Sequence, residues 1–150
     1  MADKKILTLK EAEECGMTSI LDEMMPNGEK RFRRMNNEGS GYIRTEAPEG
    51  ETKWQNAHYH EHTYELYVVQ KGMILIAYID ERNYAVISLL QKNESFLIEP
   101  GFHHNVLMAP GSVIHTLKYG DAIPPNDWHA SSWLDSVCKA VGKCFGLLLP

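Results

Sequence analysis

Cysteine is scarce in this chain of 150 residues, which has three, at Cys15, Cys138 and Cys144. Their number is odd, they are scattered, and none belongs to a C-x-x-C pair. The sequence therefore favours neither a disulfide framework nor a cysteine zinc site. We expect reduced thiols and a cytoplasmic location.

Long apolar runs and an excess of positive charge are also missing. No window approaches the roughly 18 apolar residues that cross a membrane, and the N-terminal MADKKILTLKEAEE has no apolar core of signal-peptide length. The formal net charge is −5, which argues against non-specific nucleic-acid binding, since that needs a basic surface. We therefore expect neither a membrane nor a nucleic acid as a partner.

The run KRFRR, residues 30–34, is a local exception to this acidic balance. A charge run of this kind is usually a solvated strand edge. The alternative is that it contacts an anionic ligand. The sequence leaves both interpretations open.

Short runs rich in Tyr, Val, Ile and Thr fill the middle of the chain, separated by Gly, Pro, Asn and Asp. Eight or nine short strands at this spacing favour an antiparallel sandwich or barrel over βαβ units. The expected strands are 31–35, 41–46, 52–60, 65–70, 73–79, 84–89, 95–98, 103–108 and 112–119. We assign residues 1–150 to a single domain, with a lead-in (1–30), a barrel (31–120), and a linker with a C-terminal helix (121–150).

Helical signals occur near the two ends of the chain. Thr8 followed by Glu11 fits a capping box, and Gly16 ends the helix-forming run TLKEAEEC. The segment SSWLDSVCKAVGKCFG is amphipathic, and Ser131 or Ser132 can cap it. Its apolar stripe consists of Trp133, Val137, Val141 and Phe145. We expect this stripe to pack on the barrel, with a dimer interface as the alternative.

Five of the seven histidines lie in two short windows, HYHEHTYE and PGFHHN. On an extended strand His58, His60 and His62 point to the same side, because side chains alternate. Two imidazoles one residue apart can hold one metal ion through ring nitrogens. Glu65 has the wrong parity for a straight strand, so a turn at 62–64 would have to bring it beside the histidines. The second window would supply a further ligand from a facing strand.

The first window resembles the first motif of the cupin superfamily, H-x-H-x(3,4)-E-x(6)-G. His58, His60, Glu65 and Gly72 match it without a gap. His62 is the alternative to His58, but only two residues would then separate it from Glu65, which is too short for the turn.

The window NESFLIEPGFHHNV resembles the second cupin motif, P-x-G-x-x-H-x(3)-N. His103 and His104 are adjacent, so only one of them can face inward. Alignment on Gly101 makes His104 the matching histidine and leaves His103 outward.

The sequence also departs from the two motifs. Thr52 stands where the first motif usually begins with glycine, and Asn93 replaces the leading glycine of the second. Glu99 and Met108 occupy the positions of a proline and a closing asparagine. These positions form turns rather than ligands, and Asn93 can adopt a left-handed backbone. The implied ligand set is therefore unchanged.

The resemblance implies an all-β fold, a small RmlC-like jelly roll that forms a double-stranded β-helix barrel, here with a short N-terminal helical segment and a C-terminal helix. In that family the histidines and the glutamate of the motifs bind one divalent metal ion inside the barrel. The implied ligands are His58, His60, Glu65 and His104. Three imidazoles and a carboxylate suit zinc, manganese, iron or nickel, and the sequence does not choose among them.

Alternation from these ligands predicts which side chains line the cavity. They are Tyr67 and Val69 after Glu65, Val106 and Met108 after His104, and Asn56 and Trp54 before His58. Trp54, Asn56 and Met108 are the candidates for substrate contact. We therefore expect a cavity with the metal at one end, aromatic and apolar walls, and few charges.

His62, His115 and Tyr67 are the candidates for proton transfer. His62 is expected to be a polar residue at the barrel mouth, with substrate contact or acid–base catalysis as the alternative. His115 is expected to be a partly buried histidine with its hydrogen bonds satisfied, with catalysis as the alternative. His129 is expected at the surface.

Fold and metal do not fix the chemistry, because one fold supports many activities. We favour an isomerase or epimerase acting on a sugar or a similar small hydroxylated or keto compound. The alternatives are a non-haem metal-dependent oxygenase and a non-catalytic module that binds or senses a small ligand. Besides the small molecule, we expect a homodimer, because strands at 31–46 would otherwise supply an unpaired sheet edge.

Overall fold

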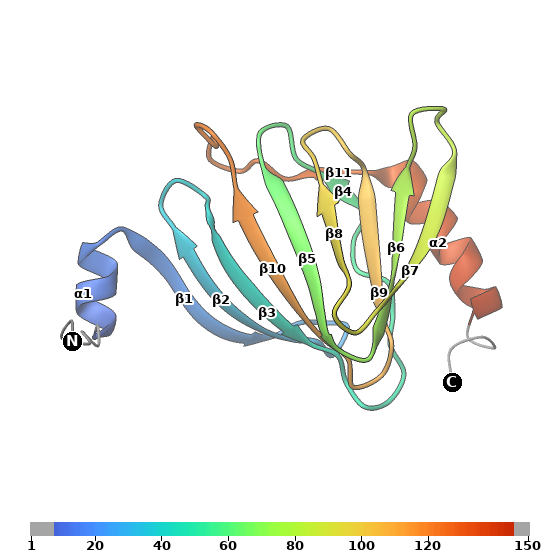
Figure 1. The fold of residues 1–150 in the computed structure, drawn as a ribbon, viewed down its shortest axis with the longest axis horizontal. Coiled ribbons are helices and arrows are strands. Elements are labelled where there is room, and N and C mark those ends of the chain that lie inside the picture. Colours follow the sequence, from blue (N-terminus) through green and yellow to red (C-terminus); the bar gives the residue numbers. More distant parts are fainter. Residues whose placement is uncertain (1–7, 146–150) are drawn as a thin grey trace.

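The structure is a computed structural model that describes residues 8–145, drawn in Figure 1. The helices of this region are α1 (Leu9–Glu14) and α2 (Ser132–Phe145). Its strands are β1 (Met17–Met24), β2 (Lys30–Asn36), β3 (Gly41–Glu46), β4 (His58–Tyr59), β5 (Tyr64–Lys71), β6 (Met73–Ile79), β7 (Ala85–Gln91), β8 (Ser95–Ile98), β9 (His104–Met108), β10 (Val113–Tyr119) and β11 (His129–Ala130). No helix among these residues is both long and apolar enough to span a membrane.

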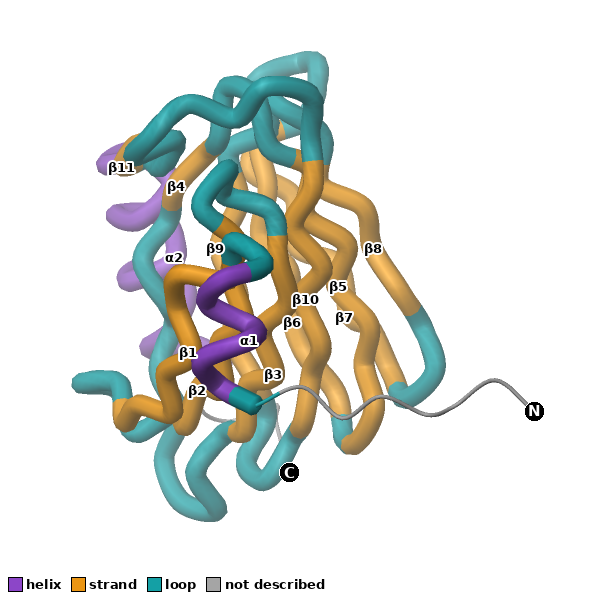
Figure 2. Tube along the Cα trace, turned by 90° about the vertical axis from the view of Figure 1, so that its left-hand side faces the viewer, coloured by secondary structure: helices purple, strands orange, loops and turns teal. Residues whose placement is uncertain are grey.

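The strands form two antiparallel sheets. The larger has the order β1-β2-β3-β10-β5-β8, and the smaller has the order β11-β4-β9-β6-β7. The helices lie at opposite ends of the molecule, α1 next to β1 and α2 next to the smaller sheet (Figure 1). Figure 2 views the molecule from the α1 end, with α2 farther back. This architecture confirms the all-β prediction with a helix near each end.

The hydrophobic core lies between the two sheets and takes side chains from both. Its buried members on strands are Tyr67, Val69, Ile74, Ile76, Leu90, Ile98, Val106, Met108 and Ile114. On β5 burial alternates as the sequence predicts, with Glu65, Tyr67 and Val69 buried. On β9 all five residues are buried, because α2 covers the outer face of this strand.

The helix α2 packs on the barrel with a different face from the expected stripe. Its buried residues are Leu134 and Cys138. They pack with Ala77 of β6 and with Ala57, the residue before β4. Trp133 is 54% exposed, so its predicted packing is wrong. The expected stripe, with its spacing of four residues, lies one position before the residues that are in fact buried. The side chain of Phe145, the last member of that stripe, lies outside the described residues. At the other end, the predicted capping box of Thr8 and Glu11 is confirmed.

The strand pattern differs from the prediction in two places. Residues 17–24 form β1, although no strand is expected within the lead-in of residues 1–30. Of the expected strand 52–60, only β4 is regular. Because β1 pairs with β2, strands β2 and β3 lie inside the sheet, and the predicted free edge at 31–46 is wrong. The edge strands of the larger sheet are β1 and β8.

Two turn positions show why the motif spacing is strict. Gly72 has φ +74°, and a Cβ there would lie 2.3 Å from the Ser112 hydroxyl oxygen, so only glycine fits. Asn93 has φ 72°, the left-handed conformation expected for it. Gly72 joins β5 to β6, and Asn93 lies between β7 and β8, where its main-chain N–H bonds the Val69 carbonyl of β5 at 2.8 Å. Both positions therefore lie where the chain crosses between the two sheets.

Candidate metal centre

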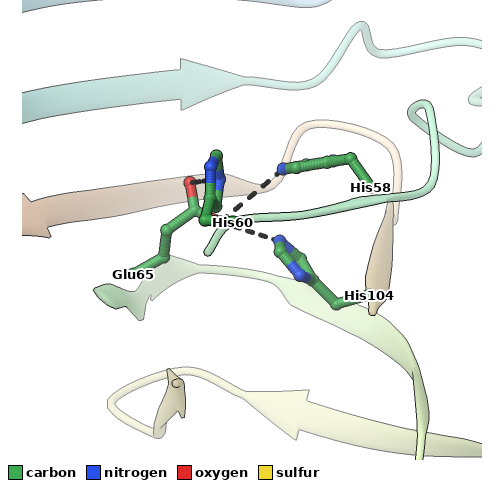
Figure 3. Close-up of side chains that lie close together, drawn as sticks. All are labelled: His58, His60, Glu65 and His104. Carbon is green, nitrogen blue, oxygen red and sulfur yellow. Dashed lines mark hydrogen bonds and ion pairs between the residues drawn. The ribbon is translucent and has the colours of Figure 1, made fainter. Parts of the chain in front are cut away.

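The four residues that the motifs single out come together at one end of the barrel. His58 on β4 pairs directly with His104 on β9, and a turn at 61–63 carries the chain from His60 to Glu65 on β5. One ligand atom from each of the four side chains lies within 4.8 Å of all the others. Figure 3 shows these side chains pointing toward a common point.

Each of the three histidines bonds a main-chain carbonyl through Nδ1. The pairs are His58 with Asn56 (2.9 Å), His60 with Asp127, and His104 with Phe102 (3.0 Å). A carbonyl oxygen only accepts, so Nδ1 carries the proton and Nε2 presents a lone pair. The three Nε2 atoms face the Glu65 carboxylate at 3.7, 3.4 and 2.7 Å. This orientation by outer partners is typical of histidines that ligate metal.

The Glu65 carboxylate is buried and remains ionised. Burial by itself raises the pKa of a carboxyl, but the Lys118 ammonium, 2.7 Å from Oε1, holds the pKa of Glu65 well below its ordinary value. Burial lowers the pKa of His58, which keeps that ring neutral. An anionic carboxylate and neutral imidazoles are the protonation states that metal ligation requires.

Two local features show that a cation fits among these residues. The Nε2 atom of His60 is buried and has no hydrogen-bond partner among the described residues. Nε2 of His104 lies 2.7 Å from Oε2 of Glu65, and two lone pairs at that distance repel unless a proton or a metal ion lies between them. The donor set therefore fits a single divalent ion.

Asp127 holds the turn that makes this arrangement possible. Its carboxylate accepts hydrogen bonds from the main-chain N–H groups of Glu61 (2.8 Å) and His62 (3.0 Å) and from the Thr63 hydroxyl (2.7 Å). Burial opposes ionisation, yet these donors lower the pKa of Asp127 from 3.8 to about 2. Its main-chain carbonyl also receives the Nδ1 proton of His60. One residue thus fixes both the turn and one candidate ligand.

Tyr67 is the one proton-transfer candidate that the structure places beside the four residues. Its hydroxyl donates to Oε2 of Glu65 at 3.1 Å and lies 3.4 Å from Nε2 of His104. Burial and the neighbouring carboxylate raise the pKa of Tyr67 well above its ordinary value. The phenol therefore stays protonated and acts as a donor.

A cavity of about 80 Å³ opens beside His58 and Glu65 inside the barrel. Its walls include Arg31 and Arg33 from β2 and Lys118 from β10. The prediction of few charges is therefore wrong. The reason is that β2 pairs with β3 and extends the larger sheet over the barrel mouth, so alternate residues of the KRFRR run face the interior.

A larger groove of about 320 Å³ shares His58, Arg31, Gln55 and Trp128 with the inner cavity. Trp128 is 48% exposed and its indole stacks on the His58 ring, with centroids 5.3 Å apart. Asn56, a candidate for substrate contact, is exposed on the rim of this groove.

Trp54, a candidate for substrate contact, lines the larger groove but does not alternate into the inner cavity as expected. This indole packs with the cluster that includes Leu134 and Cys138 of α2. Gln55 turns toward the barrel instead, donating to both carboxylate oxygens of Glu29 at 3.1 Å. Residues 51–57 form no regular strand, so the period of two does not apply to them.

The other candidates lie away from the four residues. His62 is exposed. His115 faces outward, bonded to the Tyr42 hydroxyl and to Oε1 of Gln70 at 2.6 Å each. Met108 is completely buried in the core and lines neither the inner cavity nor the groove. His103 faces away from His104 and bonds the Ser131 hydroxyl at 2.7 Å.

Sequence reasoning missed Lys118, Asp127 and Trp128. Lys118 carried a usable signal, because Ile114, Thr116 and Lys118 alternate on β10 and the first two are buried. Asp127 and Trp128 lie in a segment without regular structure that folds back over the barrel mouth, and no periodicity marks them.

No sequence family and no curated protein matches the chain, but solved structures share its fold. An RmlC-like cupin from Shewanella frigidimarina NCIMB 400 is 18% identical, with a TM-score of 0.55 over 72% of this chain and 87% of that one. A double-stranded β-helix protein from Klebsiella pneumoniae subsp. pneumoniae MGH 78578 is 14% identical, with a TM-score of 0.54 over 86% and 98%. An oxalate oxidase is 20% identical, with a TM-score of 0.52 over 71% of this chain, which spans 60% of the oxidase. The chain has the double-stranded β-helix fold of the cupin superfamily.

Proposed function

We propose that the protein binds one divalent transition metal ion, zinc, manganese, iron or nickel, through His58, His60, Glu65 and His104. The observation that carries this proposal is the shared orientation of the three rings. Each Nδ1 is held by a main-chain carbonyl, and each Nε2 is left facing the ionised Glu65. When bound, such an ion acts as a Lewis acid that polarises a carbonyl or hydroxyl oxygen.

We further propose that the site acts on a small hydroxylated or keto compound, as an isomerase or epimerase. Reactions of this class move a proton next to a polarised oxygen. Two groups of this chain reach the inner cavity and can exchange or hold protons, the Tyr67 phenol and the Lys118 ammonium. The raised pKa of Tyr67 suits it to donate a proton or a hydrogen bond rather than to abstract one.

A metal-dependent oxygenase or oxidase is the second candidate. The similarity of fold to oxalate oxidase favours it, as does a shell of three imidazoles and one carboxylate, which suits iron or manganese. Both candidates share the ligand set, so the identity of the metal and the consumption of O2 distinguish them.

Elemental analysis of protein purified without chelators tests the proposal. We expect about one metal ion per chain in the natural protein and almost none in a His104→Ala variant prepared in parallel. Iron with O2 uptake on substrate addition would favour the oxygenase, whereas zinc, manganese or nickel without O2 uptake would favour isomerisation. A metal content no higher than that of the variant would remove the metal centre and leave a non-catalytic ligand-binding module.

We also propose that the protein is a homodimer. Among the described strands β1 pairs only with β2 and ends the larger sheet, so a second copy can pair with its other side. This edge replaces the one that the sequence indicated at 31–46.

A further inference from the structure

Three cationic side chains line the inner cavity, and none of them is a candidate metal ligand. Arg31 and Arg33 are alternate residues of β2 and both line the cavity, whereas Arg34, the next residue, is not part of the lining and pairs with Asp22. Lys118 reaches the same cavity from β10. Three cations from two strands thus surround a space of about 80 Å³.

We propose that this cavity is a subsite for the carboxylate of a small hydroxy or keto acid. The inference rests on the proposed function only for the placement of the acid's oxygen next to the metal. The anion subsite itself is built from Arg31, Arg33 and Lys118.

Each cation of the lining is paired with one carboxylate. Lys118 contacts Glu65 (2.7 Å), Arg31 contacts Glu29 (2.9 Å) and Arg33 contacts Glu23 (2.6 Å). The three pairs are close to neutral in sum, so the affinity of the cavity for an anion depends on the guanidinium donors that these pairs leave free.

The arginines retain donors for a ligand. Nε of Arg31 is buried and has no hydrogen-bond partner in the described part of the chain. The guanidinium of Arg33 pairs with Glu23 through Nε, at 2.6 Å. A guanidinium matches a carboxylate through two parallel hydrogen bonds. Arg33 can therefore bind a carboxylate through its terminal nitrogens without giving up Glu23.

The size of the space indicates which part of the ligand enters it. About 80 Å³ corresponds to two or three water molecules at roughly 30 Å³ each, enough for a carboxylate and its neighbouring carbon. The adjoining groove of about 320 Å³ offers the amides Asn27, Gln55 and Asn56 and the face of Trp128. Amides and an indole face suit a hydroxylated carbon chain. The ligand is therefore an acid whose carboxylate lies in the inner cavity and whose hydroxyl groups lie in the groove.

Calorimetric titration of the natural protein with two matched probes tests the inference. Gluconate and sorbitol have the same carbon chain and differ in the terminal carboxylate. We expect gluconate to bind at least about tenfold more tightly than sorbitol. Inorganic phosphate, as a third probe, should bind more weakly than gluconate, because it lacks the hydroxylated chain.

Arg33→Gln and Arg34→Gln form a matched pair of variants, since both remove one positive charge from the same strand. Arg33→Gln should raise the Kd for gluconate about tenfold or more while leaving metal content and the weak binding of sorbitol unchanged. Arg34→Gln should leave all three values unchanged. Circular dichroism and thermal unfolding of both variants check that each remains folded.

The outcomes separate the subsite from the metal centre. Metal present with equal binding of gluconate and sorbitol, or no binding of gluconate at millimolar concentration, overturns the subsite and leaves the metal centre intact. A gluconate preference that Arg33→Gln abolishes in a metal-free protein supports the subsite and contradicts the proposed metal centre. Equal losses in Arg33→Gln and Arg34→Gln, or tighter binding of phosphate than of gluconate, also overturn the inference.

Discussion

Two groups of histidines, one facing the barrel interior and one facing outward, differ in what holds them. The inward group, His58, His60 and His104, bonds main-chain carbonyls through Nδ1. The outward residues His103 and His115 bond the hydroxyls of Ser131 and Tyr42 through Nδ1. His103 and His104 are adjacent in the chain, so one step along β9 separates the two environments.

The difference lies in what the partner allows. A carbonyl only accepts, so it fixes one tautomer and frees Nε2 as a ligand. A hydroxyl both donates and accepts, so by itself it does not fix the tautomer. At His115 the tautomer is fixed from the other side, because Oε1 of Gln70 accepts from Nε2, and that nitrogen is no longer free to ligate. Main-chain carbonyls are also held by the fold rather than by a rotatable side chain. A histidine can therefore be recognised as a candidate ligand from its outer partner, before any metal is considered.

The largest expected effect comes from breaking the inward group. His104→Ala or Glu65→Gln should weaken metal binding by more than about 100-fold, because each removes a ligand, whereas loss of an outer partner alone costs about 10–100-fold. His103→Ala is the matched control on the other face and should keep its metal. Metal content by elemental analysis gives the answer. An empty site in His103→Ala with a full one in His104→Ala would show that the register is wrong by one residue.

A smaller loss of metal affinity is expected when Asp127, which positions the inward histidines, is changed. Asp127→Asn weakens the hydrogen bonds to the 61–63 turn and should reduce metal affinity about 10–100-fold. Competition with a chromogenic chelator measures this change. Asp121→Asn, an exposed position in the same segment, is the control and should have no effect. Equal affinities of the two variants would contradict a positioning role for Asp127.

The same carboxylate predicts a dependence of stability on pH. Its folded pKa of about 2 lies below its ordinary value of 3.8. The stabilisation is therefore present above pH 4 and is lost as the pH falls through 2, and it amounts to about 2 kcal/mol. Denaturant unfolding of the natural protein and of Asp127→Asn at a series of pH values measures it. The difference in unfolding free energy should shrink between pH 4 and pH 2, and a constant difference would argue against this pKa.

The smallest expected effect on the site comes from assembly. Light scattering should give about 34 kDa, twice the 17.1 kDa of one chain, because β1 is an edge strand of the larger sheet. Metal content should be the same at all protein concentrations, since all four inward ligands come from one chain. A mass of about 17 kDa over a wide concentration range would exclude the dimer.

The sequence by itself determined the elements whose signal is local. Alternation on β5 placed Glu65, Tyr67 and Val69 inward, and the strands 41–46, 73–79 and 95–98 have the predicted bounds. Alternation allowed only one of His103 and His104 to face inward, and the resemblance to the second cupin motif, aligned on Gly101, selected the one that pairs with His58. These features follow from backbone geometry that a few neighbouring residues dictate.

Only the tertiary structure decided what surrounds the four residues. The charged cavity requires β2 to extend the larger sheet over the barrel mouth, and that extension depends on its pairing with β3. Asp127 lies 64 to 66 residues after the three residues of the 61–63 turn that it bonds. Trp54 left its expected face because its segment is not a strand. Contacts between distant segments follow from packing, and a periodic pattern cannot encode them because it reports only which face of an element is apolar.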